Sequence, residues 1–210
     1  MLKVWGRATS VNVQKVMWAV GEMGIAHERI DVGGRFGGLT APAYLALNPH
    51  ARIPTIEDDG VVVWESNAII RYLAARHGED MFWKRDPGTR AHADAWMDWM
   101  QTTLAPDFYA VFWAVVRTPA GRQDRAAIKD LTERLTAHYA LLDRQLATRP
   151  YLTGDRFSLA DIAVGVTLFR YFEMEIDRPV LANLQDWYKR LRGRPPFRDH
   201  VMISFEELRG

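Results

Sequence analysis

The stretch from Arg52 to Tyr72 constrains the fold of this chain most strongly, because it combines a hairpin pattern with a helix pattern. The runs R-I-P-T-I and V-V-V-W are rich in β-prone residues, and the turn Asp58-Asp59-Gly60 separates them. After Ser66, apolar residues recur three and four positions apart, which predicts a helix. The stretch therefore predicts a strand, a tight turn, a second strand and a helix.

Pro54 lies near the start of the first predicted strand of this hairpin. A proline has no amide hydrogen for the ladder, so it belongs at a sheet edge or at a special backbone site, and the bond before it can be cis. Such a site leaves the amide and carbonyl of Ile53 available to an extended ligand. Protection of an exposed strand edge is the simpler alternative for the same proline.

Glu65 and Ser66 stand where the predicted helix begins. The first amides of a helix lack internal partners and carry the positive end of the helix dipole, so they favour a carboxylate. Glu65 beside them suits an ammonium group. Together the two residues match the head group of an α-amino acid, whereas Ser66 alone is equally consistent with an ordinary helix cap.

The residues before this stretch predict a strand-helix-strand unit with parallel strands. The expected elements are a strand over residues 2–5, a helix that begins near Val11 and is terminated by Gly24, and a strand over 26–32. A short helix over 42–47 precedes the hairpin. The resulting order, β-α-β-α-β-β-α, predicts an α/β domain of thioredoxin-like type over residues 1–78.

No strand pattern appears after Pro87, and an all-helical second domain is predicted over residues 88–210, after a linker over 79–87. Pro106 is expected to kink the first long helix. Ser158, Asp161 and Phe157 form the pattern of a capping box with an apolar staple. The predicted helices are Thr89 to Val116, Arg122 to Leu146, one that begins after Ser158, Val180 to Leu191, and Pro195 to Leu208.

These motifs resemble the cytosolic glutathione S-transferases, in particular bacterial members of the serine type that are theta-like or nu-like. The resemblance is carried by I-P-T, the hairpin, E-S-N-A-I-I-R-Y-L and the later F-S-L-A-D-I-A, in the same order and over nearly the full chain. It implies the glutathione S-transferase fold, with glutathione as co-substrate and no permanently bound cofactor. In that family the residue before the cis-proline pairs with the cysteinyl backbone of glutathione, which is Ile53 before Pro54 here. Glu65 and Ser66 match the pair that holds the γ-glutamyl head.

A hydroxyl at the start of the first helix can stabilise the glutathione thiolate, since it can donate a hydrogen bond to sulfur and the helix dipole adds to the effect. Ser10 matches the catalytic serine of the serine-type classes in position. Asn12 is the alternative, because S-V-N resembles the T-P-N of a bacterial subgroup, and Thr9 offers a second hydroxyl. Ser10 could also act only as a helix cap.

Further residues match family positions less closely. Arg52 falls where relatives contact the glycyl carboxylate, and His50 could serve the same end, although either could be a solvated surface residue. Asp98 lies where some classes send an acid across a dimer interface to the glutathione amine. Tyr109, Phe112 and Trp113 are expected to line an apolar acceptor pocket between the domains. Packing in the core is the alternative for the same three residues.

The composition excludes several other classes of protein. The chain has no cysteine, so disulfides, thiolate metal sites and a cysteine nucleophile are excluded. A net charge of +1 gives no strong attraction to nucleic acid or to a membrane. No metal-binding histidine spacing, secretory signal or long apolar span is present, so a cytoplasmic protein without a metal is expected.

The sequence thus predicts a homodimeric glutathione transferase that activates the thiol for attack on a hydrophobic electrophile. Two alternatives share the fold. One is a glutathione-dependent disulfide reductase or isomerase, and the other is a protein that binds glutathione or another ligand without turnover.

Overall fold

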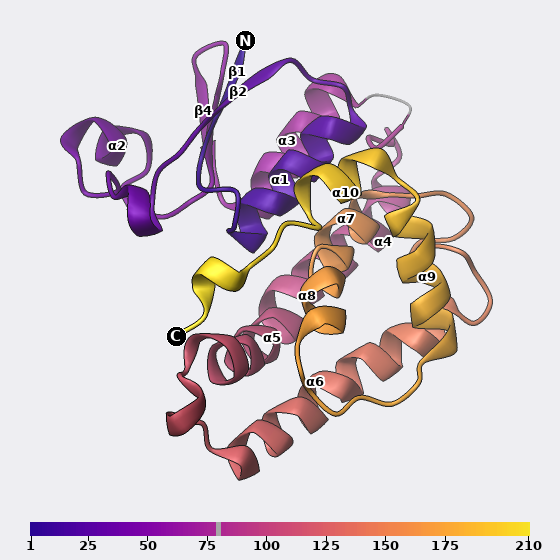
Figure 1. The fold of residues 1–210 in the computed structure, drawn as a ribbon. Helices are drawn as coiled ribbons and strands as arrows, with labels where there is room; N and C mark the ends of the chain where they lie inside the picture. Colours follow the sequence, from indigo (N-terminus) through magenta and orange to yellow (C-terminus); the bar gives the residue numbers. More distant parts are fainter. Residues whose placement is uncertain (79–80) are drawn as a thin grey trace. The chain divides into compact units, whose positions relative to one another are not determined.

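The computed structural model describes residues 1–78 and 81–210 of the chain, and its ribbon is drawn in Figure 1. The chain divides into two compact units. The first unit comprises Met1–Pro87 and Pro195–Ile203, and the second comprises Gly88–Arg194 and Ser204–Gly210.

Within the described residues, the first unit contains a four-stranded mixed sheet with the order β2-β1-β3-β4. β1 pairs in parallel with β2 and antiparallel with β3, and β3 pairs antiparallel with β4. This arrangement confirms the predicted parallel unit and the hairpin. The strands are β1 (Leu2–Trp5), β2 (His27–Ile30), β3 (Thr55–Asp58) and β4 (Val61–Trp64).

Helices α1 and α3 pack against each other, and their inner faces form the core of the first unit with β1 and β3 (Figure 1). Gly24 follows the end of α1 with a φ of 64°, a left-handed conformation that glycine adopts without strain. The predicted order of strands and helices is confirmed. The helices before the linker are α1 (Val11–Glu22), α2 (Pro42–Leu47) and α3 (Ser66–His77), with a short 3-10 turn η1 (Gly34–Phe36) before α2.

A late segment of the chain completes this unit. Helix α10 (Pro195–His200) packs on α1, and the rings of Phe197 and Trp18 meet edge to face with their centroids 4.8 Å apart. Gly21 permits the approach, since a Cβ atom built at this position would lie 2.8 Å from the Cβ of Pro196. The C-terminal segment therefore contributes to the core of the first unit.

The prediction of one helix over residues 195–208 was wrong. α10 ends at His200, and a separate 3-10 turn, η5 (Glu206–Leu208), follows. The helix-like spacing of apolar residues arises because Val201 and Phe205 are buried on either side of a break. Ser204 starts the new turn by accepting a hydrogen bond from the amide of Glu206 at 3.3 Å.

The domain boundaries inferred from sequence stay a prediction, and part of them cannot be compared with the structure. The predicted linker over 79–87 begins with residues 79–80, which lie outside the described residues. The segment 195–203 groups with the first unit, whereas the sequence placed it in the helical domain.

The first long helix of the second unit runs through two widened π segments. α4 (Pro87–Trp99) continues as η2 (Met100–Leu104), α5 (Ala105–Phe112) and η3 (Trp113–Arg117). Pro106 follows the first widening. A proline has no amide hydrogen, and its ring meets the carbonyl four residues earlier, so the helix widens before it continues.

Three further helices follow α6 (Arg125–Leu146) in sequence: α7 (Leu159–Gly165), α8 (Leu168–Glu173) and α9 (Ala182–Arg192). α6 starts later than predicted, because Asp124 caps it and accepts hydrogen bonds from the amides of Ala126 and Ala127. A 3-10 turn, η4 (Ala120–Arg122), occupies the residues before this cap. The sequence analysis did not identify the cap.

The fully buried carboxylate of Asp161 joins three parts of the second unit. One oxygen accepts from the amide of Leu152 at 3.0 Å and from the indole of Trp187 at 3.1 Å. The other accepts from the amide and hydroxyl of Ser158, each at 2.9 Å. The capping box predicted from the sequence is confirmed. Burial raises the pKa of Asp161 to about 6, against the opposing effect of these hydrogen bonds.

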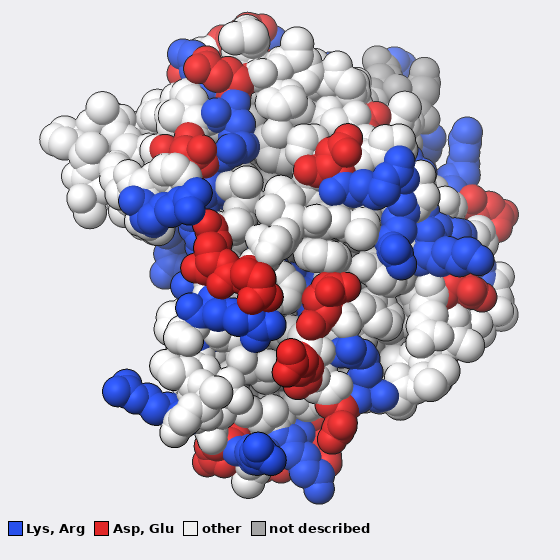
Figure 2. Space-filling view, in the orientation of Figure 1, with Lys and Arg blue, Asp and Glu red and all other residues white. Residues whose placement is uncertain are grey.

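No helix within residues 1–78 and 81–210 combines the length and the apolar character that a membrane crossing requires. On the face drawn in Figure 2, basic and acidic side chains are interspersed rather than gathered into one large patch of either sign.

We expect Asp161→Asn to lower the free energy of unfolding at pH 7 by about 3 kcal/mol, because the new amide group would point donors at the donors of Ser158. Chemical denaturation followed by tryptophan fluorescence measures the loss. Asp186→Asn on the exposed side of α9 is the matched control and should change stability by less than about 0.5 kcal/mol. Equal stability of the two variants would contradict the role given to Asp161.

The same pair of variants tests the pKa of Asp161. Its pKa is about 6 in the folded protein, against about 3.9 in an unfolded chain. Between these values the folded protein binds a proton that the unfolded chain lacks, so the contribution of this group to stability is largest at low pH and is lost as the pH rises through 6. The difference between wild type and Asp161→Asn should grow by about 1 kcal/mol from pH 7 to pH 5. A difference that shrinks toward pH 5 would refute the raised pKa.

Candidate functional site

Three segments of the first unit carry the site residues predicted from sequence: the start of α1, the turn into β3 and the start of α3. Each is a point where regular backbone pairing begins or ends, so backbone donors and acceptors are left over. Hydrogen bonds between side chains of the described residues connect the two helix starts to each other.

Ser10 occupies the N-cap position of α1, with φ and ψ of −88° and 123°. In the described part of the chain, its hydroxyl makes no capping hydrogen bond to the helix. The role of a simple cap therefore leaves this hydroxyl unexplained. Thr9 beside it is buried, and its hydroxyl oxygen accepts a hydrogen bond from Arg7 at 2.6 Å.

The start of α3 has an unusual backbone. Glu65 occupies the N-cap position with a φ of 68°, and its side chain is exposed. A positive φ is unfavourable for a residue with a Cβ atom and is frequently retained at functional sites. Ser66 is the first residue of α3 and is 3% exposed, which agrees with its predicted place at or next to the cap.

Ser66 and Asn12 link the two helix starts directly. The Ser66 hydroxyl donates to Oδ1 of Asn12 at 3.2 Å. The structure thus brings the predicted carboxylate site at α3 next to the predicted sulfur site at α1. The pair is separated by more than fifty residues in sequence, and its contact fixes how the two helices meet.

Lys15 completes this network and was missed by the sequence analysis. Its Nζ donates to Oγ of Ser66 at 3.1 Å and to Oδ1 of Asn67 at 2.9 Å, and the side chain is fully buried. Burial lowers its pKa from 10.5 to about 7, Glu65 opposes that effect and Arg71 reinforces it. A signal was present in the sequence, because a charged residue stands among Val11, Val16 and other apolar residues of one helix.

The turn into β3 carries Ile53 and Pro54, and the bond between them is cis, the isomer indicated by the sequence. Pairing of β1 with β3 stops at Trp5 and Thr55, so both residues lie beyond the last paired position. Ile53 is partly exposed. This geometry is consistent with the predicted role of the Ile53 backbone as a place for an extended ligand to pair.

Two side chains that the sequence analysis did not single out hold this turn. The carbonyl of Arg52 accepts from the hydroxyl of Tyr44 at 2.6 Å and from the amide of Asn48 at 3.0 Å. Both side chains also bond the Thr55 hydroxyl, at 3.0 and 3.1 Å. Tyr44 belongs to α2 and Asn48 directly follows that helix. Both are buried, so the turn is held by side chains that are shielded from solvent.

Arg52 and His50 both have exposed side chains near the same turn. The ring of His50 lies edge to face against Trp64 of β4, with their centroids 4.8 Å apart. Both residues stay predictions as contacts for a carboxylate.

The remaining predicted residues belong to the second unit. Asp98 is exposed on α4. Phe112 is buried and packs against Phe205, whereas Tyr109 is 37% exposed and Trp113 is 66% exposed. The alternative of core packing thus describes Phe112, and the side chains of Tyr109 and Trp113 are open to solvent.

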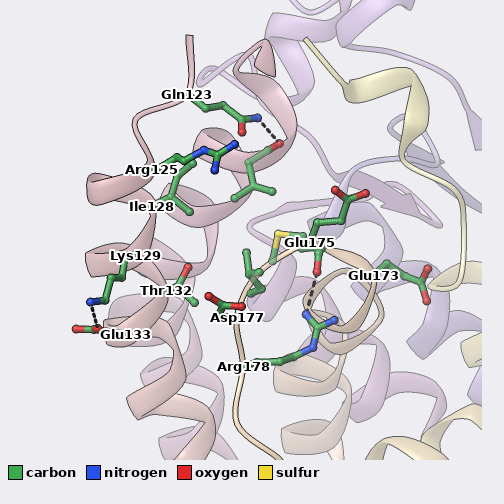
Figure 3. Close-up of a pocket in the computed structure, with 13 residues that line it drawn as sticks. Gln123, Arg125, Ile128, Lys129, Thr132, Glu133, Glu173, Glu175, Asp177 and Arg178 are labelled. Carbon is green, nitrogen blue, oxygen red and sulfur yellow. Dashed lines mark hydrogen bonds and ion pairs between the residues drawn. The ribbon is translucent and has the colours of Figure 1, made fainter. Parts of the chain in front are cut away.

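A cavity of about 680 Å³ lies in the second unit, between α6 and the segment 173–178, and side chains of both charge signs line it (Figure 3). The guanidinium of Arg178 donates to the carbonyls of Tyr171, Phe172 and Met174 and so fastens the end of α8. The residues that line this cavity include none of the site residues predicted from sequence. Among the described residues, no group of His, Asp and Glu side chains could hold a metal ion.

We expect Asn48→Ala to lower the free energy of unfolding by about 2 kcal/mol, since it removes the donor to the Arg52 carbonyl and to the buried Thr55 hydroxyl. Denaturant unfolding measures the change, and Gln185→Ala on the exposed side of α9 is the control. If both variants unfold at the same denaturant concentration, Asn48 does not hold the turn.

Comparison with known proteins places these features in a family. Residues 9–76 match the family model described as glutathione S-transferase, N-terminal domain, and residues 125–190 match that of the C-terminal domain. Glutathione S-transferase GstB of Escherichia coli K12 is 38% identical over 205 residues, which cover 97% of this chain and 99% of that protein.

Solved structures give the same result. The theta class glutathione S-transferase of Xanthomonas axonopodis pv. citri with glutathione bound superimposes with a TM-score of 0.92 at 45% identity and covers 97% of this chain and 98% of its own. Glutathione transferase F2 of Populus trichocarpa, at 23% identity and a TM-score of 0.85 over 96% of this chain and 97% of its own, shares the fold. The fold class predicted from sequence is confirmed.

Proposed function

The chain belongs to the glutathione S-transferase family, and from this premise we propose that it binds glutathione on its first unit and adds the thiolate to an electrophile. The observation that carries the proposal is the hydrogen bond between Ser66 and Asn12. It joins the start of α3, which suits the γ-glutamyl head, to the start of α1, which suits the sulfur.

The binding of glutathione is proposed to use three groups of atoms. The first amides of α3 and the Ser66 hydroxyl receive the γ-glutamyl carboxylate, and the exposed Glu65 receives the ammonium group. The backbone of Ile53 pairs with the cysteinyl residue. Arg52, with His50 as the alternative, receives the glycyl carboxylate. The relative with glutathione bound, at 45% identity, supports glutathione as the ligand.

We propose Ser10 as the residue that stabilises the thiolate, ahead of Asn12 and Thr9. Its hydroxyl stands at the amino end of α1 and makes no capping bond within the described residues. Thr9 is buried and bonded to Arg7, and the Asn12 oxygen already accepts from Ser66. A donor to sulfur at a helix start lowers the thiol pKa, and holding both reactants together adds to the rate.

The acceptor substrate is proposed to be a hydrophobic electrophile, and the exposed Tyr109 and Trp113 are the residues offered for it. The homodimer, the reach of Asp98 to a partner's glutathione and the cytoplasmic location stay predictions. Glutathione acts as a co-substrate rather than as a resident cofactor.

Ser10→Ala should raise the pKa of the enzyme-bound glutathione thiol by about one to two pH units, because a donor to the thiolate is lost. Titration of the thiolate absorbance in the ultraviolet measures it. Asn12→Ala and Thr9→Ala are compared in the same assay. If Ser10→Ala leaves the titration unchanged while Asn12→Ala shifts it, the activating group is Asn12.

The hydrogen bond between Ser66 and Asn12 supports a second candidate reaction, because it connects the asparagine of S-V-N to the proposed glutathione site. This reaction is disulfide reduction with two glutathiones, or a glutathione-assisted isomerisation. Comparing the rate with a chloro-nitro aromatic and the rate with a small disulfide distinguishes conjugation from disulfide reduction. Conjugation is expected to be the faster. A protein that retains immobilised glutathione and turns over neither substrate would be a binding protein instead.

A further inference from the structure

Lys15 is a fully buried cation whose side chain runs from α1 to the first residues of α3. A buried ammonium is costly unless acceptors surround it, so such a residue is retained only where its charge or its hydrogen bonds are used. The packing of α1 alone does not require a charge, because Val11, Trp18 and Ala19, one turn away from Lys15 on the same helix, are apolar and buried.

The hydrogen bonds of Lys15 determine the direction of the Ser66 hydroxyl. An ammonium group has donors only, so the Ser66 oxygen must accept from Nζ, 3.1 Å away. The hydroxyl proton then points elsewhere, and in the present structure it points to Oδ1 of Asn12. The same ammonium holds Oδ1 of Asn67, the second residue of α3, at 2.9 Å.

We propose that Lys15 is a positioning residue for the γ-glutamyl carboxylate of glutathione: it donates to the Ser66 oxygen, so that the hydroxyl proton can pass from Oδ1 of Asn12 to the bound carboxylate, and it places a positive charge beside the first two residues of α3. This inference rests on the proposed function of the site. Lys15 does not touch the ligand; it acts through Ser66 and the helix start. A carboxylate there gains the Ser66 hydroxyl as a donor, because Lys15 already occupies an acceptor site of that oxygen, and it gains a nearby opposite charge.

The proposal makes the charge of Lys15 and the binding of glutathione mutually dependent. If the charged form of Lys15 binds glutathione more tightly than the neutral form by some factor, bound glutathione must shift the protonation equilibrium of Lys15 toward the charged form by the same factor. Two charged residues at α3 act on this group in opposite directions, since Glu65 raises the pKa of Lys15 and Arg71 lowers it. On α10, which also packs on α1, His200 lies beside Gly21 at the far end of the helix. With a pKa of about 7 in the free protein, Lys15 changes its charge in a range that solution experiments reach easily.

The variant Lys15→Met tests the positioning role, since methionine fits a similar volume without charge or donors. Calorimetric titration at pH 6.5 should show a dissociation constant for glutathione about tenfold above wild type, with kcat at saturating glutathione within about twofold. Ser66→Ala and the double variant complete a cycle. Because the two residues act through one hydroxyl, the double variant should bind much more tightly than the product of the single losses predicts.

The outcomes separate this inference from the function on which it rests. Absence of glutathione binding by the wild-type protein would refute the proposed function. Wild-type affinity of Lys15→Met, or losses that multiply in the double variant, would refute the role of Lys15 alone. A loss confined to kcat would refute it as well.

A measurement on the wild-type protein covers the case in which Lys15→Met does not fold. The pKa of Lys15 is followed by carbon NMR of labelled lysine side chains, with and without saturating glutathione. A tenfold mutual effect corresponds to a rise of about one pH unit in the pKa of Lys15 on binding. Lys129 on the exposed face of α6 is the internal control and should not change. An unchanged or lowered pKa of Lys15 would overturn the proposal.

Discussion

The site depends on the requirement that a buried ammonium be surrounded by oxygen atoms. Lys15 is fully buried on α1, and it donates to side-chain oxygens of the first two residues of α3. Displacement of either helix along its axis would move these acceptors away from the ammonium group and leave its charge without partners, at a cost of several kcal/mol. The start of α3 is therefore held in one register against α1. The hydrogen bond from Ser66 to Asn12 then brings together the two helix starts to which the proposed function assigns the γ-glutamyl head and the sulfur.

Buried polar groups perform the corresponding task elsewhere in both units. Tyr44 and Asn48 hold the carbonyl of Arg52, so the turn at Pro54 is fixed by side chains that are themselves hidden from solvent. In the second unit, Asp161 gathers the amide of Leu152 and the indole of Trp187. In each case a polar atom with several partners specifies a geometry that apolar packing alone would leave less well defined. The residues that meet a ligand can then remain on the surface.

Local patterns in the sequence were sufficient to predict most helices and strands of the first unit. The hairpin, the proline before β3 and the Glu65-Ser66 pair are contiguous, so their roles could be inferred from neighbours in the chain. Lys15 stands out in the sequence as a charge among apolar residues, but its partners could not be inferred, because they are set by packing between distant segments. The partners of Asn48 are only four and seven residues away, but no local pattern indicates that its side chain turns back onto them. Asp124 was overlooked since the apolar spacing of α6 gives no exact start. The break after His200 was missed because Val201 and Phe205 keep a helical spacing across it.

The docking of α10 on α1 has a consequence for the way the protein is made. The indole of Trp18 is fully buried, and one of its neighbours is the ring of Phe197, which lies near the opposite end of the chain. A ribosome that adds about 5–20 residues per second needs roughly 10–40 s to pass from one to the other. During that interval the nascent sheet and its helices display an uncovered aromatic surface. Residues 195–203 must therefore be synthesised before the first unit can close.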